Sequence, residues 1–442
     1  MKADLVNYDV QPCIVLGGRT ERITLKPRGQ HANFDDHSEY TIEIVPMETS
    51  PMKRLLLDRN AVFNTTMTYQ PDRITARPVK GCLYFTYCFE AEQQYVLDIW
   101  SSQEPNKKQQ FRLYALHPDL YALRPFKGDL HIHSNRSDGR QEPGIVAANF
   151  RRAGFDFIAI TDHSKYQPSL EAMERFADVP TGLAMFPGEE IHIGGYMHAV
   201  NVGGRFSVNE RYFSDEHKFQ AQIDRIARTT SLPEGINPLE FALRKWVSDR
   251  IREGGGLSVI VHPHWIHPYL YNYNMQDTMT DFLFENNIYD AFEVCSRYAR
   301  MNLQVAFYND QRAKGRKIPI VGASDTHDSE ADRQDAAYTL AFAADCTFPS
   351  IYKAVMSLYS VAVQPITDST YFICGPYRMV KYGSFLLEQF YPRHDDLCLE
   401  LGIQMKNHVL GDHGALSILQ QTHGMVERYS HQCFSTFTGG SA

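Results

Sequence analysis

The sequence predicts an α/β fold in which a barrel-type domain follows a small all-β domain. Three observations favour this fold class. Short strand patterns fill about the first 120 residues, nearly continuous apolar runs alternate with helical segments from Gly128 onward, and ligand-type polar residues stand at the ends of those runs. The chain has 442 residues. A single hydrophobic core usually stops growing at roughly 250 to 300 residues, so two domains are expected.

Residues 1–120 are predicted to form a β-sandwich. The segments ERITLKP, YTIEIVP, GCLYFTYCF and QYVLDIW are short runs separated by Gly, Pro, Asn and Asp turns. No helical period persists in this part of the chain. Several short strands at this spacing are typical of a sandwich of about one hundred residues. The segment HPDLYALRPFKGD is interpreted as the linker that follows.

Residues 127–364 are predicted to form the α/β domain. The segments FDFIAITDH, LSVIVHPH and KIPIVGASD contain apolar runs of the kind found in parallel strands that are buried on both faces. Between two such runs, EPGIVAANFRRAG has Pro143 near a helix start and ends at Gly154, which are typical helix boundaries. This alternation indicates an α/β barrel or a doubly wound sheet.

Two further segments complete the expected organisation. Residues 203–254 form a helical insertion with two helix candidates, and we expect it to lie on a rim of the barrel. Within it, Leu239, Leu243 and Trp246 follow helical spacing, so we interpret them as core residues. Residues 365–442 are mixed in character and are expected to pack on the barrel as a C-terminal extension.

Composition excludes several classes of protein. A net charge of −8 and a pI near 6.1 argue against a stable nucleic-acid complex, because nucleic-acid binders normally carry a basic surplus. The apolar runs are far shorter than the roughly 18 residues of a membrane span. The first 18 residues lack the pattern of a secretory signal, so a cytoplasmic protein is expected. The eight cysteines are scattered and predict reduced thiols, whereas the 18 histidines are unusual.

Metal-ligand residue types gather at the ends of the predicted strands. His131 and His133 share one face of the strand DLHIH, since alternate residues of a strand point to the same side. The other strand ends carry Asp162 and His163, Glu189 and Glu190, His198, His262 and His264, and Asp325 and His327. Strands that end in this way predict an α/β barrel with its active site at the carboxyl ends of the strands.

The residue types indicate which ions such a site would bind. Imidazole and carboxylate ligands without thiolate favour Zn²⁺, Mn²⁺ or Fe²⁺. The candidates are too many for one ion and would fill two or three sites with a bridging carboxylate. Ions about 3.5 to 4 Å apart activate a water and hold both ends of a phosphoryl displacement.

The order of these motifs resembles that of the PHP (polymerase and histidinol phosphatase) family of metal-dependent phosphoesterases. The segment GDLHIHSNRSDG is similar to the family's first motif almost residue for residue, and TDH, GEE, HP and SDTH follow in the family's order. The resemblance extends from Lys127 to about Gln364. It implies a distorted (β/α)7 TIM-like barrel that holds a three-metal cluster.

The resemblance also implies the ligands of each ion. The first ion takes His131, His133, Glu190 and Asp325; the second takes Glu190, His198 and His262; the third takes Asp138, His163 and His327. Glu189 and Glu190 face opposite sides of a strand, so only one can bridge, and the family's Gly-x-Glu pattern selects Glu190. Glu189 is then a supporting or structural residue. Asp129 either orients a ligand imidazole or accepts hydrogen bonds at the end of its strand. Asp162 is a candidate for the second of these roles, a hydrogen-bond acceptor at a strand end.

In addition to Glu190 and Asp325, residues outside the ligand set are candidates for a role in the reaction. Arg297 follows the predicted strand DAFEVCS and is a candidate clamp for a substrate phosphate, although an exposed or ion-paired arginine is the alternative. His264 is a candidate proton donor to the leaving group, as is His267.

The resemblance implies hydrolysis of a small phosphorylated metabolite or nucleotide, with a metal-bridging hydroxide beside Glu190 as the nucleophile. Two alternatives remain open. The same cluster would also hydrolyse a carbamate, ester or amide, because the β-rich segment before the barrel resembles the architecture of carbaryl-hydrolase-like PHP proteins. The other alternative is a non-catalytic, metal-stabilised binding protein. The sequence determines neither the substrate nor the oligomeric state.

Overall fold

The computed structural model describes residues 4–48, 52–57, 65–69, 71–193, 197–267, 271–296, 301–332, 336–367 and 370–434. The chain divides into two compact units. The first unit comprises Met1–Ala122, Ser384–His394 and Met425–Ala442, and the second comprises Leu123–Gly383 and Asp395–Gly424. The predicted C-terminal extension is thus shared between the units, while the boundaries 1–120, 127–364 and 365–442 remain predictions. Among the described residues, no helix combines the length and apolarity needed to cross a bilayer.

The first unit is built mainly of strands. They are β1 (Tyr8–Gln11), β2 (Ile14–Leu16), β3 (Thr20–Pro27), β4 (Tyr40–Pro46), β5 (Met52–Leu57), β6 (Thr65–Tyr69), β7 (Asp72–Ala76), β8 (Leu83–Cys88), β9 (Gln93–Ser101) and β10 (Gln109–Leu116), with the 3-10 helix η1 (Gln30–Ala32) and the helix α1 (Pro118–Tyr121). One sheet has the order β1-β3-β8, another has the order β2-β10-β9-β4-β7, and β5 pairs with β6. The predicted strand-rich character is confirmed.

The core of the first unit follows from strand alternation. Ile42 and Ile44 on β4 and Leu97 and Ile99 on β9 are at most 1% exposed, and each pair lies two residues apart. Ile42 pairs with Ile99 and Ile44 with Leu97 across the two strands. Cross-strand apolar pairs of this kind stabilise one face of a sheet against the core.

The second unit is of mixed α/β type, as the sequence predicts. Its strands are β11 (Arg124–Ile132), β12 (Phe157–Ile160), β13 (Ala184–Phe186), β14 (Gly188–Ile193), β15 (Met197–Val202), β16 (Leu257–Ile260), β17 (Ala291–Cys295), β18 (Ile320–Gly322), β19 (Tyr338–Ala343), β20 (Ser360–Thr367) and β21 (Thr370–Cys374). Its helices are α2 (Pro143–Arg152), α3 (Gln167–Arg175), α4 (Val208–Ser214), α5 (Glu216–Thr229), α6 (Pro238–Glu253), α7 (Asp277–Glu285), α8 (Met301–Ala313) and α9 (Phe348–Met356).

The C-terminal helices complete the chain. They are α10 (Tyr377–Gln389), α11 (Tyr391–Val409), α12 (Ala415–Thr422) and α13 (Met425–Cys433). Of these, α12 lies wholly within the second unit and α13 within the first.

Two sheets of the second unit are connected to each other at two places. One has the order β13-β12-β11-β19-β20-β21 and the other has the order β14-β15-β16-β17-β18. Two isolated parallel bridges connect them, Ile132 to Thr326 at the end of β11 and His163 to Glu190 between β12 and β14. The strand β11 runs parallel to β12, and β16 and β18 run parallel to β17. The parallel bridge between Ile132 and Thr326 aligns the two groups, so their carboxyl ends lie at one edge.

Among the strands that carry ligand-type residues, β15 departs from the expected parallel arrangement. The strand β15 is antiparallel to both β14 and β16. Only residues 194–196 separate β14 from β15, whereas a parallel connection needs a crossover of a dozen residues or more. The reversal has a useful consequence: the beginning of β15, rather than its end, lies at the edge where the parallel strands finish.

The strands place an apolar layer on the same side of the sheet as the ligand-type residues. Val200 and Val202 belong to a buried apolar cluster and share strand parity with His198 on β15. Ala291 belongs to the same cluster and shares parity with Glu293 on β17. The polar residues at this edge therefore pack against a close-packed apolar layer, which restricts their rotamers.

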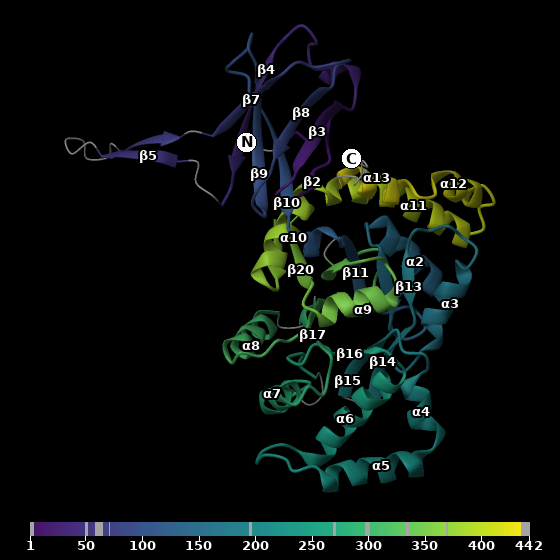
Figure 1. Cartoon of the computed structure of the whole chain (residues 1–442). Coiled ribbons are helices and arrows are strands. Elements are labelled where there is room, and N and C mark those ends of the chain that lie inside the picture. The colour runs from purple at the N-terminus through teal and green to yellow at the C-terminus, as the bar shows by residue number, and fades with distance from the viewer. Residues whose placement is uncertain are drawn as a thin grey trace, which may run out of the picture. The chain divides into compact units, whose positions relative to one another are not determined.

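The helical insertion contains three helices rather than the predicted two. Figure 1 shows α4, α5 and α6, in teal, grouped together. Trp246 on α6 is 4% exposed and packs edge-on against Phe219 of α5 with ring centroids 4.9 Å apart, which confirms its core role. Leu239 was expected in the same stripe but is 54% exposed, because it lies in the first turn of α6, ahead of the buried positions.

Candidate metal centre

All nine ligands that the sequence analysis assigns come together at the edge described above. His131 lies near the end of β11 and His133 just beyond it, whereas His163, His262 and Asp325 follow β12, β16 and β18. Glu190 is the third residue of β14, and its bridge to His163 brings it level with the end of β12. His198 reaches the same edge because β15 runs in the opposite direction.

The first group surrounds one oxygen of Glu190. Glu190 Oε2 lies 3.4 Å from His131 Nε2 and 3.4 Å from His133 Nε2. Asp325 Oδ1 lies 3.3 Å from His131 Nε2 and 3.1 Å from His133 Nε2. Divalent ions bind nitrogen and oxygen ligands at about 2.0–2.2 Å, which leaves neighbouring ligand atoms roughly 3 Å apart. These four residues therefore have the spacing of ligands around a single ion.

The second group surrounds the other oxygen of the same carboxylate. Glu190 Oε1 lies 2.8 Å from His198 Nδ1 and 3.2 Å from His262 Nε2. Glu190 is fully buried, and each of its two oxygens faces a different set of imidazoles. A carboxylate in this position is suited to bridge two ions.

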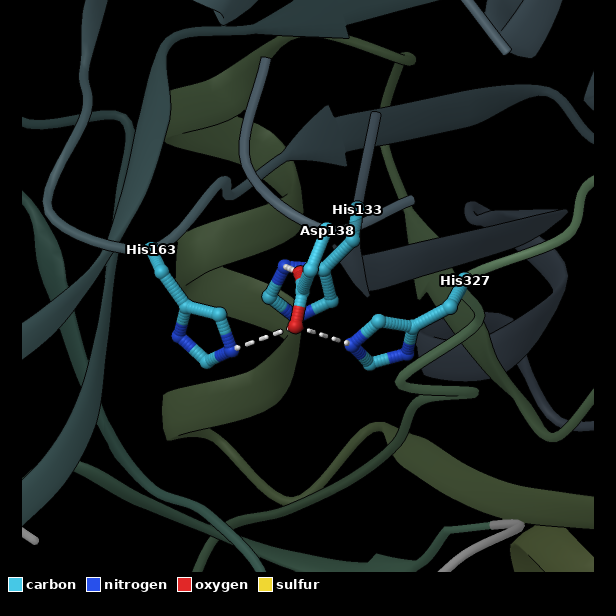
Figure 2. A group of neighbouring side chains, drawn as sticks. All are labelled: His133, Asp138, His163 and His327. Carbon is cyan, nitrogen blue, oxygen red and sulfur yellow. Dashed lines mark ion pairs between the residues drawn. The ribbon is translucent and has the colours of Figure 1, made fainter. Parts of the chain in front are cut away.

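The third group is more open to solvent. Asp138 Oδ2 lies 3.5 Å from His163 Nε2 and 3.4 Å from His327 Nε2. Figure 2 shows this oxygen between the two imidazoles, with the ring of His133 beside them. His133 stacks on His327 with ring centroids 4.3 Å apart. The side chain of Asp138 is 54% exposed, so this group forms the solvent-facing end of the cluster.

Unpaired buried atoms show that the donor set fits divalent ions. The buried atoms without a hydrogen-bond partner include His131 Nε2, His133 Nε2, His163 Nδ1, Glu190 Oε2 and His198 Nδ1. Buried polar atoms are rarely left unpaired, because each loses its hydration without compensation. Several orphaned atoms that converge on one place are explained if they coordinate cations instead, and imidazole with carboxylate suits Zn²⁺, Mn²⁺ or Fe²⁺.

Glu293 is a site residue that the sequence analysis missed. It is fully buried on β17, and its Oε2 lies 2.8 Å from His131 Nδ1. Its Oε1 accepts a hydrogen bond of 3.2 Å from the backbone N–H of His262. A proton held on His131 Nδ1 leaves Nε2 free to bind an ion, as carboxylate–histidine pairs do in metalloproteins. The available signal was an acidic residue within the apolar strand DAFEVCS.

Two aspartates shape the backbone of the site instead of binding a ligand imidazole. The carboxylate of Asp162 accepts hydrogen bonds from the backbone N–H and hydroxyl of Ser134 and of Ser137, and so orders the turn that carries Asp138. Asp129 accepts from the backbone N–H of His131 and of Ser324. Of the two roles considered for Asp129, the structure supports the strand-end acceptor.

Glu189 faces away from the cluster, as strand parity predicts. Its carboxylate accepts hydrogen bonds from Ser207 Oγ at 2.7 Å, Asn209 Nδ2 at 2.8 Å and Asn201 Nδ2 at 3.1 Å. The backbone N–H of Val208, the first residue of α4, also donates to it. A carboxylate at a helix start stabilises the free N–H groups there, so Glu189 anchors α4.

Two ligand residues have strained backbone conformations. His262 has a φ of 26° and Asp325 a φ of 53°, in the left-handed region that residues with a Cβ seldom adopt. Such strain persists where the surrounding structure imposes it, typically at functional sites. In both cases the strained residue follows the end of a strand and brings its side chain into the cluster, His262 beside Glu190 and Asp325 beside His131 and His133.

Charge interactions set the protonation states of the cluster without ions. Burial alone would raise the pKa of Glu190, but in the acidic range where a carboxyl group titrates the protonated imidazoles of His198 and His131 hold it well below its usual value. Burial likewise opposes ionisation of Asp325, but the positive charge of His131 outweighs the effect of burial. The pKa of Asp325 is therefore also lowered. Burial lowers the pKa of His198 to about 4. The carboxylates are therefore ionised at neutral pH, and His198 is already a neutral ligand.

Binding of divalent ions at pH 7 is expected to release protons. Burial lowers the pKa of His163, but the charge of Glu190 outweighs it and raises the pKa to about 9. This imidazole is therefore protonated at pH 7 and must lose its proton to coordinate an ion. Calorimetric titration of metal-free protein with Mn²⁺, in buffers of different ionisation enthalpy, measures the release. It should fall as the pH rises through about 9, and no release at pH 7 would contradict these protonation states.

The remaining predicted residues lie in different places. His264 is 4% exposed, and its Nε2 lies 2.9 Å from Asp277 Oδ1 rather than among the nine ligands. Arg297 lies outside the described residues. His192, to which the sequence analysis assigns no role, pairs with His198 across β14 and β15, with ring centroids 4.4 Å apart. Its parity with Glu190 is the sequence signal for this position.

Comparison of the sequence with curated proteins finds a match to a short segment of the chain. No family model matches the chain. The DNA polymerase/3'-5' exonuclease PolX of Bacillus subtilis is 40% identical over 58 residues, which are 13% of this chain and 10% of that protein. The chain therefore spans only a small part of this curated relative.

Several solved structures are similar to the chain at low sequence identity. A two-domain protein from Bacteroides vulgatus that contains a predicted PHP-like metal-dependent phosphoesterase is 18% identical, with 55% of this chain and 66% of that chain covered and a TM-score of 0.40. An amidohydrolase from Chromobacterium violaceum, solved with bound sulfate and no metal, is 19% identical, with 46% and 87% covered and a TM-score of 0.31.

Proposed function

We propose that this protein is a metal-dependent hydrolase that cleaves a phosphate ester of a small anionic metabolite or nucleotide. The observation that carries the proposal is the position of Glu190, whose two oxygens face two different groups of imidazoles within the spacing of metal ligands. The cofactors are two or three divalent metal ions, which are Mn²⁺, Zn²⁺ or Fe²⁺. The nine assigned residues would hold them, with Asp138, His163 and His327 at the third position.

The ions, when bound, supply an activated water and positive charge that offsets the charge of a phosphoryl group. The protein residues supply the positioning. Glu190 would fix the first two binding positions relative to each other, and Asp325 would complete the first of them. Glu293 would keep the proton of His131 on Nδ1. His264 and Arg297 remain the proposed proton donor and phosphate clamp. The Asp277 carboxylate 2.9 Å from His264 Nε2 would hold that imidazole in orientation.

The finer features of the fold belong to the same proposal. We infer that the seven strands β11, β12 and β14–β18, linked by the two isolated bridges, form the distorted (β/α)7 barrel that the resemblance implies. We also infer that the two sheets of the first unit face each other as a sandwich, which Tyr8 of β1 and Phe111 of β10 support through an edge-on contact with centroids 5.4 Å apart. A cytoplasmic location completes the proposal.

Hydrolysis of a carbamate, ester or amide is the second candidate function. The cluster would activate water in the same way for attack on carbon. The loop after β16 favours this candidate, because it exposes apolar side chains within about a dozen residues of His262 along the chain: Ile266 is 37% exposed and Tyr273 is 36% exposed. The partial match to a protein whose name includes 3'-5' exonuclease, an activity that breaks phosphodiester bonds, supports the phosphate ester instead.

Phosphate release from a panel of phosphomonoesters and nucleotides by Mn²⁺-loaded protein tests the proposed function. The wild-type protein should release phosphate, and His131→Ala should not. His413→Ala, which replaces an exposed histidine outside the cluster, is the matched control and should retain activity. If the wild-type protein holds its ions and releases no phosphate from any ester, the phosphoesterase proposal is wrong, and carbamates, esters and amides become the substrates to assay.

A further inference from the structure

The loop after β16 places an indole beside the second group of metal ligands. The backbone N–H of Trp265 donates a 2.9 Å hydrogen bond to the carbonyl of His262, and its carbonyl accepts a 2.8 Å hydrogen bond from Asn274. An antiparallel bridge between Ile266 and Tyr273 follows directly. The backbone of Trp265 is therefore fixed from both sides, three residues after a ligand.

The Trp265 side chain packs against the ligands themselves. Its ring centroid lies 5.5 Å from that of His198, with 31° between the planes, and 6.1 Å from that of His262. His267 lies on it edge-on at 5.6 Å. Trp265 is nevertheless only partly buried, whereas His198 and His262 are 7% and 3% exposed. Its ring therefore lies against the imidazoles that face Glu190 Oε1 and is itself partly accessible to a bound molecule.

Resting on the proposed function, we propose that Trp265 is a specificity-determining residue that selects phosphate esters whose alcohol portion carries a planar aromatic ring. A phosphoryl group held beside His198 and His262 leaves its ester substituent next to the indole. Aromatic rings and nucleobases stack on tryptophan through flat apolar surfaces and complementary quadrupoles, which a saturated group of the same size cannot match. The substrate class is thus an aryl-bearing or nucleobase-bearing phosphomonoester.

Two esters of matched size and similar leaving-group chemistry separate stacking from general apolar contact. Benzyl phosphate and cyclohexylmethyl phosphate differ in the planarity of the ring, and both leave as primary alcohols. The wild-type protein should show a KM for benzyl phosphate that is lower by about tenfold, the scale of one stacking contact. Trp265→Ala should remove this preference, and Trp265→Phe should keep part of it. The control Phe213→Ala, which removes an exposed aromatic side chain on α4, away from the loop after β16 and outside the nine candidate ligands, should leave the ratio unchanged.

Binding of non-hydrolysable phosphonates provides a readout that is independent of turnover. Calorimetric titration of Mn²⁺-loaded protein should show tighter binding of phenylphosphonate than of cyclohexylphosphonate, and Trp265→Ala should equalise them. An unchanged preference in a folded Trp265→Ala protein, in either assay, would overturn the inference. Failure of the proposed function looks different: no ester of either kind is hydrolysed, while the phosphonate titrations still report on Trp265.

Discussion

Replacement of Asp325 by asparagine is expected to lower kcat/KM for phosphate release by roughly 10³-fold, since a lost Lewis acid forfeits several kcal/mol and each 1.36 kcal/mol is a factor of ten. Asp325 Oδ1 lies 3.3 Å from His131 Nε2 and 3.1 Å from His133 Nε2, within the first ligand group. Asparagine tolerates the left-handed backbone of this position, so the change removes a charged ligand without imposing new strain.

The matched control for this prediction is Asp328→Asn, three residues further along the chain. Asp328 binds Arg140 and Gln141 and contacts none of the nine ligands among the described interactions. Its replacement should leave kcat/KM within a few-fold of the wild-type value. Circular dichroism and urea unfolding should show that both variants are folded. A folded Asp325→Asn protein with wild-type activity would remove Asp325 from the site.

Replacement of Glu293 by glutamine is expected to weaken Mn²⁺ binding by about 10- to 100-fold, the range found when partners of metal-binding histidines are changed. The two oxygens of Glu293 face two donors, His131 Nδ1 at 2.8 Å and the backbone N–H of His262 at 3.2 Å. A glutamine has only one oxygen, so its NH₂ group must oppose one of these donors. Calorimetric titration with Mn²⁺ measures the affinity.

Glu189→Gln is the matched control, because Glu189 is equally buried but faces the start of α4. This change should lower the free energy of unfolding by about 1–3 kcal/mol, the cost of a disrupted buried hydrogen-bond acceptor. Its affinity for Mn²⁺ should stay within a few-fold of the wild-type value. If the two variants have the same metal affinity, Glu293 does not support the ligands as described.

Strand position and motif order were sufficient to predict that the nine candidate ligand residues lie together. His131 and His133 could be paired because a strand has a period of two, and Glu190 could be separated from Glu189 by the same rule. The structure brings these residues together because alternate residues of a strand point to the same side of the sheet. The likeness of GDLHIHSNRSDG to a known motif supplied the grouping of the nine residues, which spacing alone left open.

Features that depend on long-range pairing could not be predicted from the sequence. The direction of β15 depends on its pairing with β14 and β16, and the partnership of Glu293 with His131 joins residues 162 positions apart. The position of Trp265 after a predicted strand end makes it a candidate for the mouth of the site, but only the structure shows that its ring lies against His198. The division of residues 365–442 between two units likewise follows from tertiary packing.

The central claim is that Glu190 bridges divalent ions held by the surrounding histidines and aspartates. Its most direct test is the number of Mn²⁺ ions bound per chain at equilibrium, measured for the wild-type protein and for Glu190→Gln beside the control Glu189→Gln. The account predicts at least two ions for the wild-type protein and for Glu189→Gln, and a clear loss of bound ions in Glu190→Gln. A wild-type protein that binds no Mn²⁺, Zn²⁺ or Fe²⁺, or a Glu190→Gln variant that binds as many ions as the wild type, would contradict it.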